Sequence, residues 1–124
     1  MNEKKRVALI GWNPEVVDYS KWPDLNPEKL TAALEADKNK LNELGYEAKL
    51  LFIDDAGSAY DVVKHSLVEE SYDCVLLGAG VRTVPEHFIV FERLINAVHE
   101  FAPKAKICFN TNPKDTAEAV QRWV

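Results

Sequence analysis

Arg82 is the residue of this sequence best suited to bind an anion, because it lies between two glycines and the start of a helix. Gly78 and Gly80 precede it in the stretch GAGVRT, and Pro85 follows it at the beginning of an apolar helical pattern. Glycines let the backbone approach a ligand closely. A helix N-terminus favours an anion by ~0.3–1 kcal/mol, and a hydrogen bond from a guanidinium adds ~1.5–3 kcal/mol. These residue types predict a site for a phosphate or a carboxylate.

Polar residues also end two other apolar segments: Asp54, Asp55, Asn110, Thr111 and Asn112. If these segments are parallel strands of one sheet, the polar side chains lie at the same edge as Arg82. His87 and Asp54 are the two candidates for proton transfer there. The alternative is that Arg82 pairs with Asp54, Asp55 or Glu86 and that the asparagines only cap helices.

The elements that would position these residues alternate along the chain. Four segments have the length and apolar content of buried strands: residues 6–12, 46–53, 72–80 and 105–111. Helical patterns cover residues 27–44, a segment opened by a capping box of Ser58 and Asp61, residues 85–102 and the segment from Asn112 to the end. This alternation predicts a parallel sheet with right-handed crossovers and helices on both faces.

The pattern resembles the flavodoxin-like superfold, a Rossmann-like three-layer α/β sandwich with strand order 2-1-3-4-5. Because the sequence has four strand segments, we expect the order 2-1-3-4 without the fifth strand, in a single domain of residues 1–124. The sequence also resembles short bacterial α/β proteins, and this resemblance implies no activity. A resemblance at the level of the fold does not specify a function. It implies only where a ligand binds, which is at the carboxyl ends of strands 1 and 3, where the strand order reverses.

The connection between the first strand and the first helix, residues 13–26, is much longer than the usual two to six residues. It contains Val16, Tyr19 and Trp22, so we expect it to cover the crevice between strands 1 and 3. The alternative is that Tyr19 and Trp22 only pack against the end of the sheet. The complete set of predicted ligand-binding residues is Trp12, Asn13, Trp22, Gly78, Gly80, Arg82, Asn110, Thr111 and Asn112.

Several functions of similar folds require motifs that this sequence lacks. A phosphorelay receiver has paired acids where Trp12 and Asn13 stand, and the stretch GWNPEVVDYS is not the Ser/Thr/Gly-rich phosphate loop of flavodoxin. GAGVRT has two of the three glycines of a dinucleotide fingerprint, and there is no Walker lysine loop. Cys74 and Cys108 lack zinc-ligand spacing and are expected in the core. The sequence therefore indicates no cofactor and no metal, and it leaves open whether the protein is an enzyme.

The net charge and the hydropathy of the chain limit the partners and the cellular location that we expect. A net charge of -5 argues against nucleic acids and anionic membranes, whose phosphates attract clustered Lys and Arg. The sequence has neither an apolar run of ~18 residues nor a secretory signal, so we expect a cytoplasmic protein.

Two features of the sequence suggest a second copy of the chain as a partner. The helical pattern of residues 85–102 is apolar around about half its circumference, and the last strand lies at an edge of the predicted sheet. These features predict a homodimer through that helix or that strand, unless the last helix covers the surplus. A non-catalytic oligomeric or interaction module is therefore the alternative to a protein that binds a small anionic metabolite.

Asp37 stands within the apolar stripe of the helix at residues 27–44, between Leu34 and Leu41. Burial of an unpaired carboxylate is costly. We therefore expect Asp37 to be partly exposed or to have a partner, either within the chain or across a dimer interface.

Overall fold

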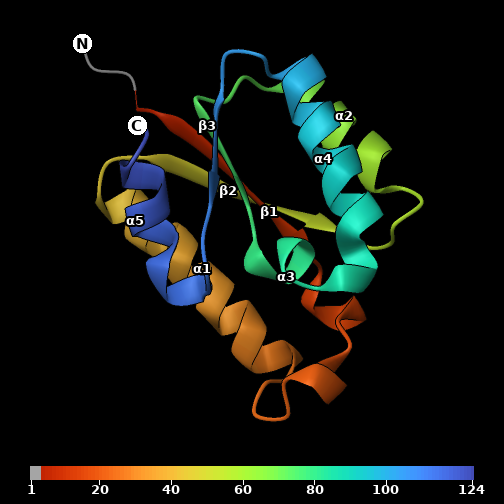
Figure 1. The fold of residues 1–124 in the computed structure, drawn as a ribbon. Coiled ribbons are helices and arrows are strands. Elements are labelled where there is room, and N and C mark those ends of the chain that lie inside the picture. The colour runs from red at the N-terminus through yellow and green to blue at the C-terminus, as the bar shows by residue number, and fades with distance from the viewer. Residues whose placement is uncertain (1–3) are drawn as a thin grey trace.

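The computed structural model describes residues 4–124, which form a parallel sheet with helices on both faces (Figure 1). The strands are β1 (Arg6–Trp12), β2 (Glu47–Ile53), β3 (Cys74–Leu77) and β4 (Lys106–Phe109). Their order is β2-β1-β3-β4, and each neighbouring pair is parallel. The predicted α/β fold and its 2-1-3-4 strand order are therefore confirmed. β3 and β4 are shorter than predicted, because helical turns begin at residues 79 and 113.

Alternation along the strands divides the apolar side chains between two cores. Ala8 and Ile10 of β1 face α2 (Ala59–Glu69) and α4 (Phe88–Phe101). Val7 and Leu9 face the opposite way, toward α1 (Pro27–Glu43) and α5 (Thr116–Gln121). Successive strand residues point to opposite faces, so a strand covered on both sides must be apolar throughout. The result is a three-layer sandwich, with α1 and α5 on one face and α2 and α4 on the other (Figure 1).

The predicted ends of α1 are correct. The side chain of Asn26 accepts a hydrogen bond from the N–H of Lys29 (2.8 Å), which satisfies a free donor of the first turn. Gly45 adopts a φ of 100° after the last turn, a conformation that residues with a Cβ rarely take.

α2 begins after Ser58, as predicted, but the predicted capping box is absent, because Ser58 makes no side-chain capping bond. The carboxylate of Asp55 instead accepts the N–H of Ser58 (2.8 Å). Asp55 is therefore part of the turn that leads into α2.

The helix predicted at residues 85–102 consists of a 3₁₀ turn and an α-helix, and a further short helix precedes it. A short helix, α3 (Ala79–Arg82), and a 3₁₀ turn, η3 (Pro85–His87), precede α4. The sequence does not predict a helix at residues 79–82, because Gly80 lowers the intrinsic helix propensity of the stretch. α3 begins directly at the end of β3, so it sets the direction in which Arg82 points.

Another 3₁₀ turn, η4 (Pro113–Asp115), leads into α5. Asn112 and Asp115 form a reciprocal capping box across it. This pair completes the cap that the sequence predicts from Asn112.

The two cysteines are buried in the core, as expected. Their sulfur atoms lie 3.4 Å apart on neighbouring strands. The hydrogen bond with Cys74, together with burial, raises the pKa of the Cys108 thiol. Both cysteines therefore behave as packing residues. In the part of the chain that the structure describes, no helix has the length and apolar character needed to span a membrane.

Candidate functional site

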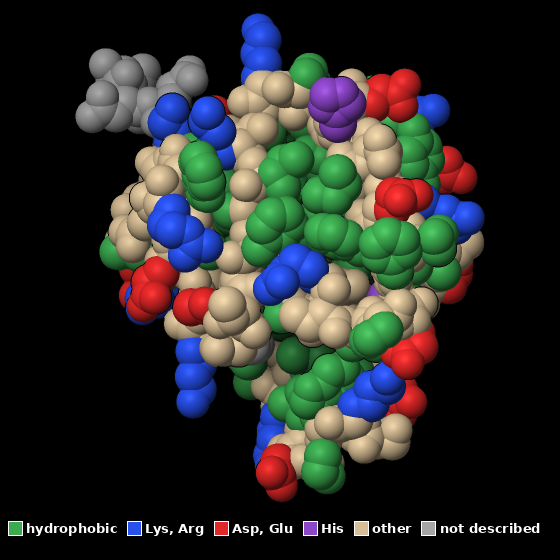
Figure 2. All heavy atoms as spheres, in the orientation of Figure 1, with side chains coloured by type: hydrophobic (Ala, Val, Ile, Leu, Met, Phe, Trp, Pro, Cys, Tyr) green, Lys and Arg blue, Asp and Glu red, His purple; other side chains and the backbone are tan. Residues whose placement is uncertain are grey.

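A cavity of about 740 Å³ lies at the carboxyl ends of the strands, between α1, α3 and the β1–α1 loop of residues 13–26. Figure 2 shows a hollow with hydrophobic walls at this end of the molecule. The volume falls within the range of ~300–1,000 Å³ typical of small-molecule sites. The cavity therefore lies where the reversal of strand order predicts a ligand site.

Most predicted site residues line the cavity: Trp12, Trp22, Asp54, Gly78, Gly80, His87, Asn110, Thr111 and Asn112. Asn13 and Arg82 are not among the lining residues. Asn13 accepts the N–H of Glu15 (3.0 Å) and donates to the carboxylate of Asp54 (2.9 Å). Its side chain therefore holds the start of the β1–α1 loop against the end of β2.

Arg82 faces β4. Its guanidinium donates to the backbone oxygen of Asn110 (2.8 Å) and lies 5.6 Å from the ring centre of Phe109. The acidic partners considered for Arg82 interact elsewhere, since Asp54 accepts from Asn13 and Glu86 pairs with Lys21. Within the described residues, the buried Nε of Arg82 has no hydrogen-bond partner. Arg82 thus fastens α3 to the end of β4.

Gly78 has a packing role in addition to its place in the cavity wall. A Cβ at this position would lie 3.3 Å from the backbone oxygen of Ile10. That approach is tighter than ordinary van der Waals contact. Gly78 therefore allows the turn after β3 to pack closely against β1.

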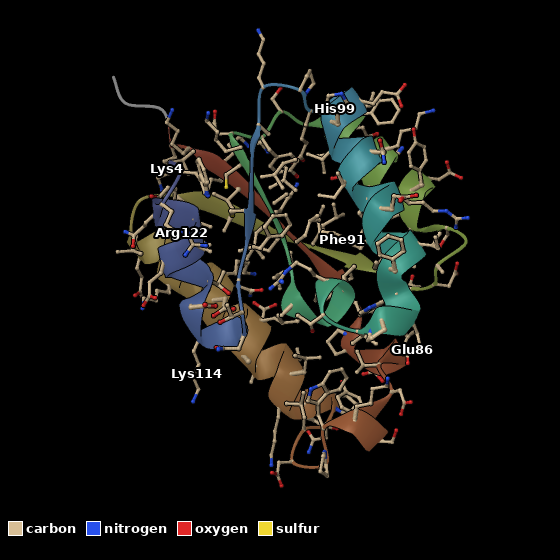
Figure 3. The ribbon with its side chains drawn as sticks, in the orientation of Figure 1. Lys4, Glu86, Phe91, His99, Lys114 and Arg122 are labelled. Atoms are coloured by element: carbon tan, nitrogen blue, oxygen red, sulfur yellow. The ribbon has the colours of Figure 1, made fainter. Side chains whose placement is uncertain are left out.

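The β1–α1 loop crosses the cavity and is attached to its far wall. It contains two 3₁₀ turns, η1 (Pro14–Val16) and η2 (Tyr19–Lys21). The ammonium of Lys21 pairs with Glu86 (2.8 Å), which lies just before α4 on the side of the loop (Figure 3). Trp22 lines the cavity and is still 37% exposed. The loop therefore covers the crevice while the side chain of Trp22 stays partly exposed.

His87 contacts the same wall through one nitrogen. Its Nδ1 lies 3.3 Å from the indole Nε1 of Trp12 and 3.3 Å from the backbone oxygen of Gly80. Nδ1 accepts from Trp12 only when it carries no proton, and it donates to Gly80 only when it carries one. The two hydrogen bonds therefore exclude each other, and in the first case the proton of a neutral ring lies on Nε2.

Asp37 has a partner within the chain. The hydroxyl of Thr116 donates to its Oδ2 (2.7 Å), and the amide of Asn110 donates to that hydroxyl (2.9 Å). The N–H of Ala79 in turn donates to the side-chain oxygen of Asn110 (2.9 Å). All four residues line the cavity. We call this series of hydrogen bonds the Asp37 chain.

Burial raises the pKa of Asp37, and the hydrogen bond from Thr116 opposes that effect. The nearby Asp115 also raises this pKa, whereas Lys40 lowers it. Burial has the largest influence of the four, because it disfavours the ionised form. Asp37 is therefore an ionisable group held in a partly apolar setting, as binding and catalytic carboxylates often are.

The other carboxylates of the cavity wall are exposed and interact with nearby donors. The hydrogen bond from Ser58 lowers the pKa of Asp55, and the bond from Lys21 lowers that of Glu86. The wall carries Asp18, Asp37, Asp54, Asp55 and Glu86, with Lys21 as its only lysine or arginine among the described residues. Negative charge therefore predominates at the mouth. In residues 4–124, no group of three or more His, Cys, Asp or Glu side chains could hold a metal ion.

Apolar residues of α1 and its neighbours form a part of the wall that the sequence does not predict: Leu25, Leu30, Leu34, Phe52 and Val84. Leu30 and Leu34 belong to the apolar stripe of α1, which the helical pattern places in the core. Both are only partly buried. The signal available in the sequence is that this stripe extends to the first turn of the helix, beyond the edge of a short sheet.

Comparison of the chain with protein-family models and with curated proteins finds no match. The fold and the site together define an open parallel α/β sheet with a cavity at its switch point.

Proposed function

We propose that the protein binds a small molecule in the cavity at the carboxyl ends of β1 and β3. One observation carries the proposal: the cavity has the volume of a ligand site, apolar walls and a few polar groups that converge on it. Trp12, Trp22 and the leucines of α1 would contact an apolar part of the ligand. Asp37, Asn110 and Thr111 would contact a polar part.

The phosphate or carboxylate expected from the sequence remains a proposal for that polar part. Asn110, Thr111 and Asn112 on the wall favour such an anion, whereas Arg82 faces β4 and does not line the cavity. The predominance of carboxylates on the wall opposes it, because like charges repel. The apolar surface supports a ligand with a substantial hydrophobic body in either case.

A thermal-shift screen tests the proposal. The panel contains phosphates, nucleotides and carboxylic acids, together with aromatic amines and neutral aromatic compounds. A ligand at ~100 times its Kd adds about 2.7 kcal/mol, which raises the unfolding midpoint of a domain this size by several degrees. Trp22→Ala should reduce the shift, whereas Trp123→Ala, at an exposed position outside the cavity, should not. No shift with any compound would contradict the proposal.

A homodimer through β4 and α4 is the second candidate. Lys106 donates its N–H to the backbone oxygen of Asp73, the residue before β3, so the N–H and C=O groups of Ile107 point toward the open edge of the sheet. Hydrophobic side chains gather over β4 and the adjacent side of α4 (Figure 2). Phe88 of α4 is 61% exposed. A second copy paired at this edge would extend the sheet and cover the apolar surface.

Light scattering during size-exclusion chromatography distinguishes a dimer from a monomer. Phe88→Glu should weaken a dimer formed through this surface. Val68→Glu is a matched control, because Val68 is a similarly exposed apolar residue of α2. A monomer at every concentration would contradict this second proposal and leave the first unaffected.

A further inference from the structure

Asp37 is the feature of the cavity that structural packing explains least. It stands between Leu34 and Leu41 on the inner side of α1, where an apolar residue would cost less. It is half-buried, and it lines the cavity. A carboxylate in such a position needs compensating interactions.

The Asp37 chain supplies only part of that compensation. Oδ2 accepts from Thr116, and within the described residues Oδ1 has no hydrogen-bond partner. Thr116 is 2% exposed and Asn110 is 6% exposed, so the donors behind Asp37 are fixed in the core. The chain therefore orients the carboxylate and leaves one of its oxygens to accept a further hydrogen bond.

The surrounding charges indicate what kind of donor would suit that oxygen. Lys21, the one lysine of the wall in the described chain, is already paired with Glu86, and Arg82 is bound to the end of β4. Lys40 lowers the pKa of Asp37 less than the Thr116 hydrogen bond does. No cation of the described residues neutralises Asp37 by direct contact. A cationic group of a ligand would do so.

We infer that Asp37 selects a ligand that carries a protonated amine on an aromatic or other apolar body. The ammonium binds the carboxylate of Asp37, and the apolar body lies against Trp12, Trp22 and the leucines of α1. A charge-assisted hydrogen bond in a partly apolar setting is among the stronger polar contacts in proteins. This inference rests on the proposed function, since it assigns a ligand class to the same cavity.

Three indoles that differ in charge test the inference: tryptamine as the cation, 3-methylindole as the neutral compound and indole-3-acetic acid as the anion. Their Kd values are measured by isothermal titration calorimetry with the full chain. We expect tryptamine to bind the unmodified protein about tenfold or more tighter than either of the other two.

Asp37→Asn removes the charge and keeps an oxygen that accepts the Thr116 hydroxyl. It should abolish the preference for tryptamine and leave the Kd of 3-methylindole unchanged. Asp61→Asn is the matched control, because Asp61 is an exposed residue of α2 outside the cavity, and it should retain the preference. Unfolding midpoints verify that both variants are folded.

The outcomes separate this inference from the proposed function. Equal binding of the three indoles, a preference for the acid, or a preference that survives in Asp37→Asn would overturn the inference while ligand binding stands. The inference would also be overturned if other compounds of the thermal-shift panel bind and none of the three indoles does. The absence of a thermal shift with every compound of the panel would instead contradict the proposed function.

Discussion

The two ends of the sheet contain different kinds of interaction. At the amino end, the guanidinium of Arg6 binds Glu47 (2.9 Å) and Glu70 (2.8 Å), and Lys49 binds Glu70 as well. The backbone N–H of Arg6 also donates to Asp73 (2.8 Å). At the carboxyl end, hydrogen bonds hold the rim of a cavity whose walls are largely apolar.

The residues that stabilise this small sheet by ion pairs therefore lie at the end opposite to the cavity. Charges at the amino end neutralise one another and leave little for a ligand. At the carboxyl end, one oxygen of Asp37 and the exposed part of the Trp22 ring make no contact within residues 4–124 that the fold requires. Parallel α/β sheets place their ligand sites at this end because loops and helix starts converge there.

Asn110→Ala should have the largest effect on stability, because Asn110 connects Ala79 and Thr116 at the carboxyl end of the sheet. Asn110→Ala leaves the N–H of Ala79 without its acceptor and Thr116 without the Asn110 donor, in a buried setting. We expect a loss of about 2–3 kcal/mol in the free energy of unfolding, measured with urea. Asn39→Ala, at an exposed position of α1, is the control. A loss below ~0.5 kcal/mol would mean that Asn110 does not hold this end together.

Loss of the ion pairs at the amino end should have the second-largest effect on stability. Arg6→Ala removes two salt bridges, a bond to the backbone oxygen of Ser71 and a contact with the ring of Tyr72. Partly exposed pairs contribute ~0.2–1 kcal/mol each, so we expect a loss of about 1–1.5 kcal/mol in urea unfolding.

Arg93→Ala is the matched control for Arg6→Ala, because exposed Arg93 makes a single bond to the backbone oxygen of Ala56. It should cost less than ~0.5 kcal/mol. Equal losses for the two variants would remove the distinction between the ends. Ligand affinity should be the same in both variants as in the unmodified protein.

The link between the β1–α1 loop and α4 should matter for local motion more than for global stability. Lys21→Ala breaks an exposed pair with Glu86, so the free energy of unfolding should change by less than ~0.5 kcal/mol. Amide hydrogen exchange in residues 13–26 should nevertheless become faster, since the loop loses an attachment. Lys38→Ala, which breaks the pair with Glu35 within α1, should leave that exchange unchanged. Unchanged exchange in Lys21→Ala would show that the loop is held by other contacts.

A further small effect on stability concerns the pH dependence of Asp37. Burial raises its pKa in the folded state above the ordinary value of 3.8, so the folded protein binds the proton more tightly than the unfolded chain does. Stability from this group is therefore present at low pH and is lost as pH rises through the folded-state pKa. Asp37→Asn should be more stable than the unmodified protein at about pH 7, by less than ~1 kcal/mol, and the gain should vanish near pH 3. Urea unfolding at both pH values measures it, and a variant less stable at neutral pH would contradict the sign.

The sequence predicts the strand order well because alternation of apolar strands and amphipathic helices leaves few topologies. It also predicts which loops meet, since the switch point follows from that order. The sequence does not predict α3, because glycines lower the helix propensity of that stretch. This short helix directs Arg82 to the backbone oxygen of Asn110. The sequence predicts correctly that Asp37 is partly exposed or has a partner, but it does not identify that partner, Thr116, which is 79 residues away in the chain. Tertiary contacts between distant residues decide both cases, and local patterns do not report them.

The indole N–H resonances of the three tryptophans provide the sharpest test of ligand binding in the cavity at the carboxyl ends of β1 and β3. Trp12 and Trp22 line the cavity, whereas Trp123 follows α5 near the C-terminus, on the side of the amino ends of the strands (Figure 1). Titration with tryptamine, or with the strongest compound of the thermal-shift panel, is followed by ¹⁵N-correlated NMR. We expect saturable shifts of the Trp12 and Trp22 signals and a constant Trp123 signal. Equal movement of all three signals, or movement of Trp123 alone, would contradict ligand binding in this cavity.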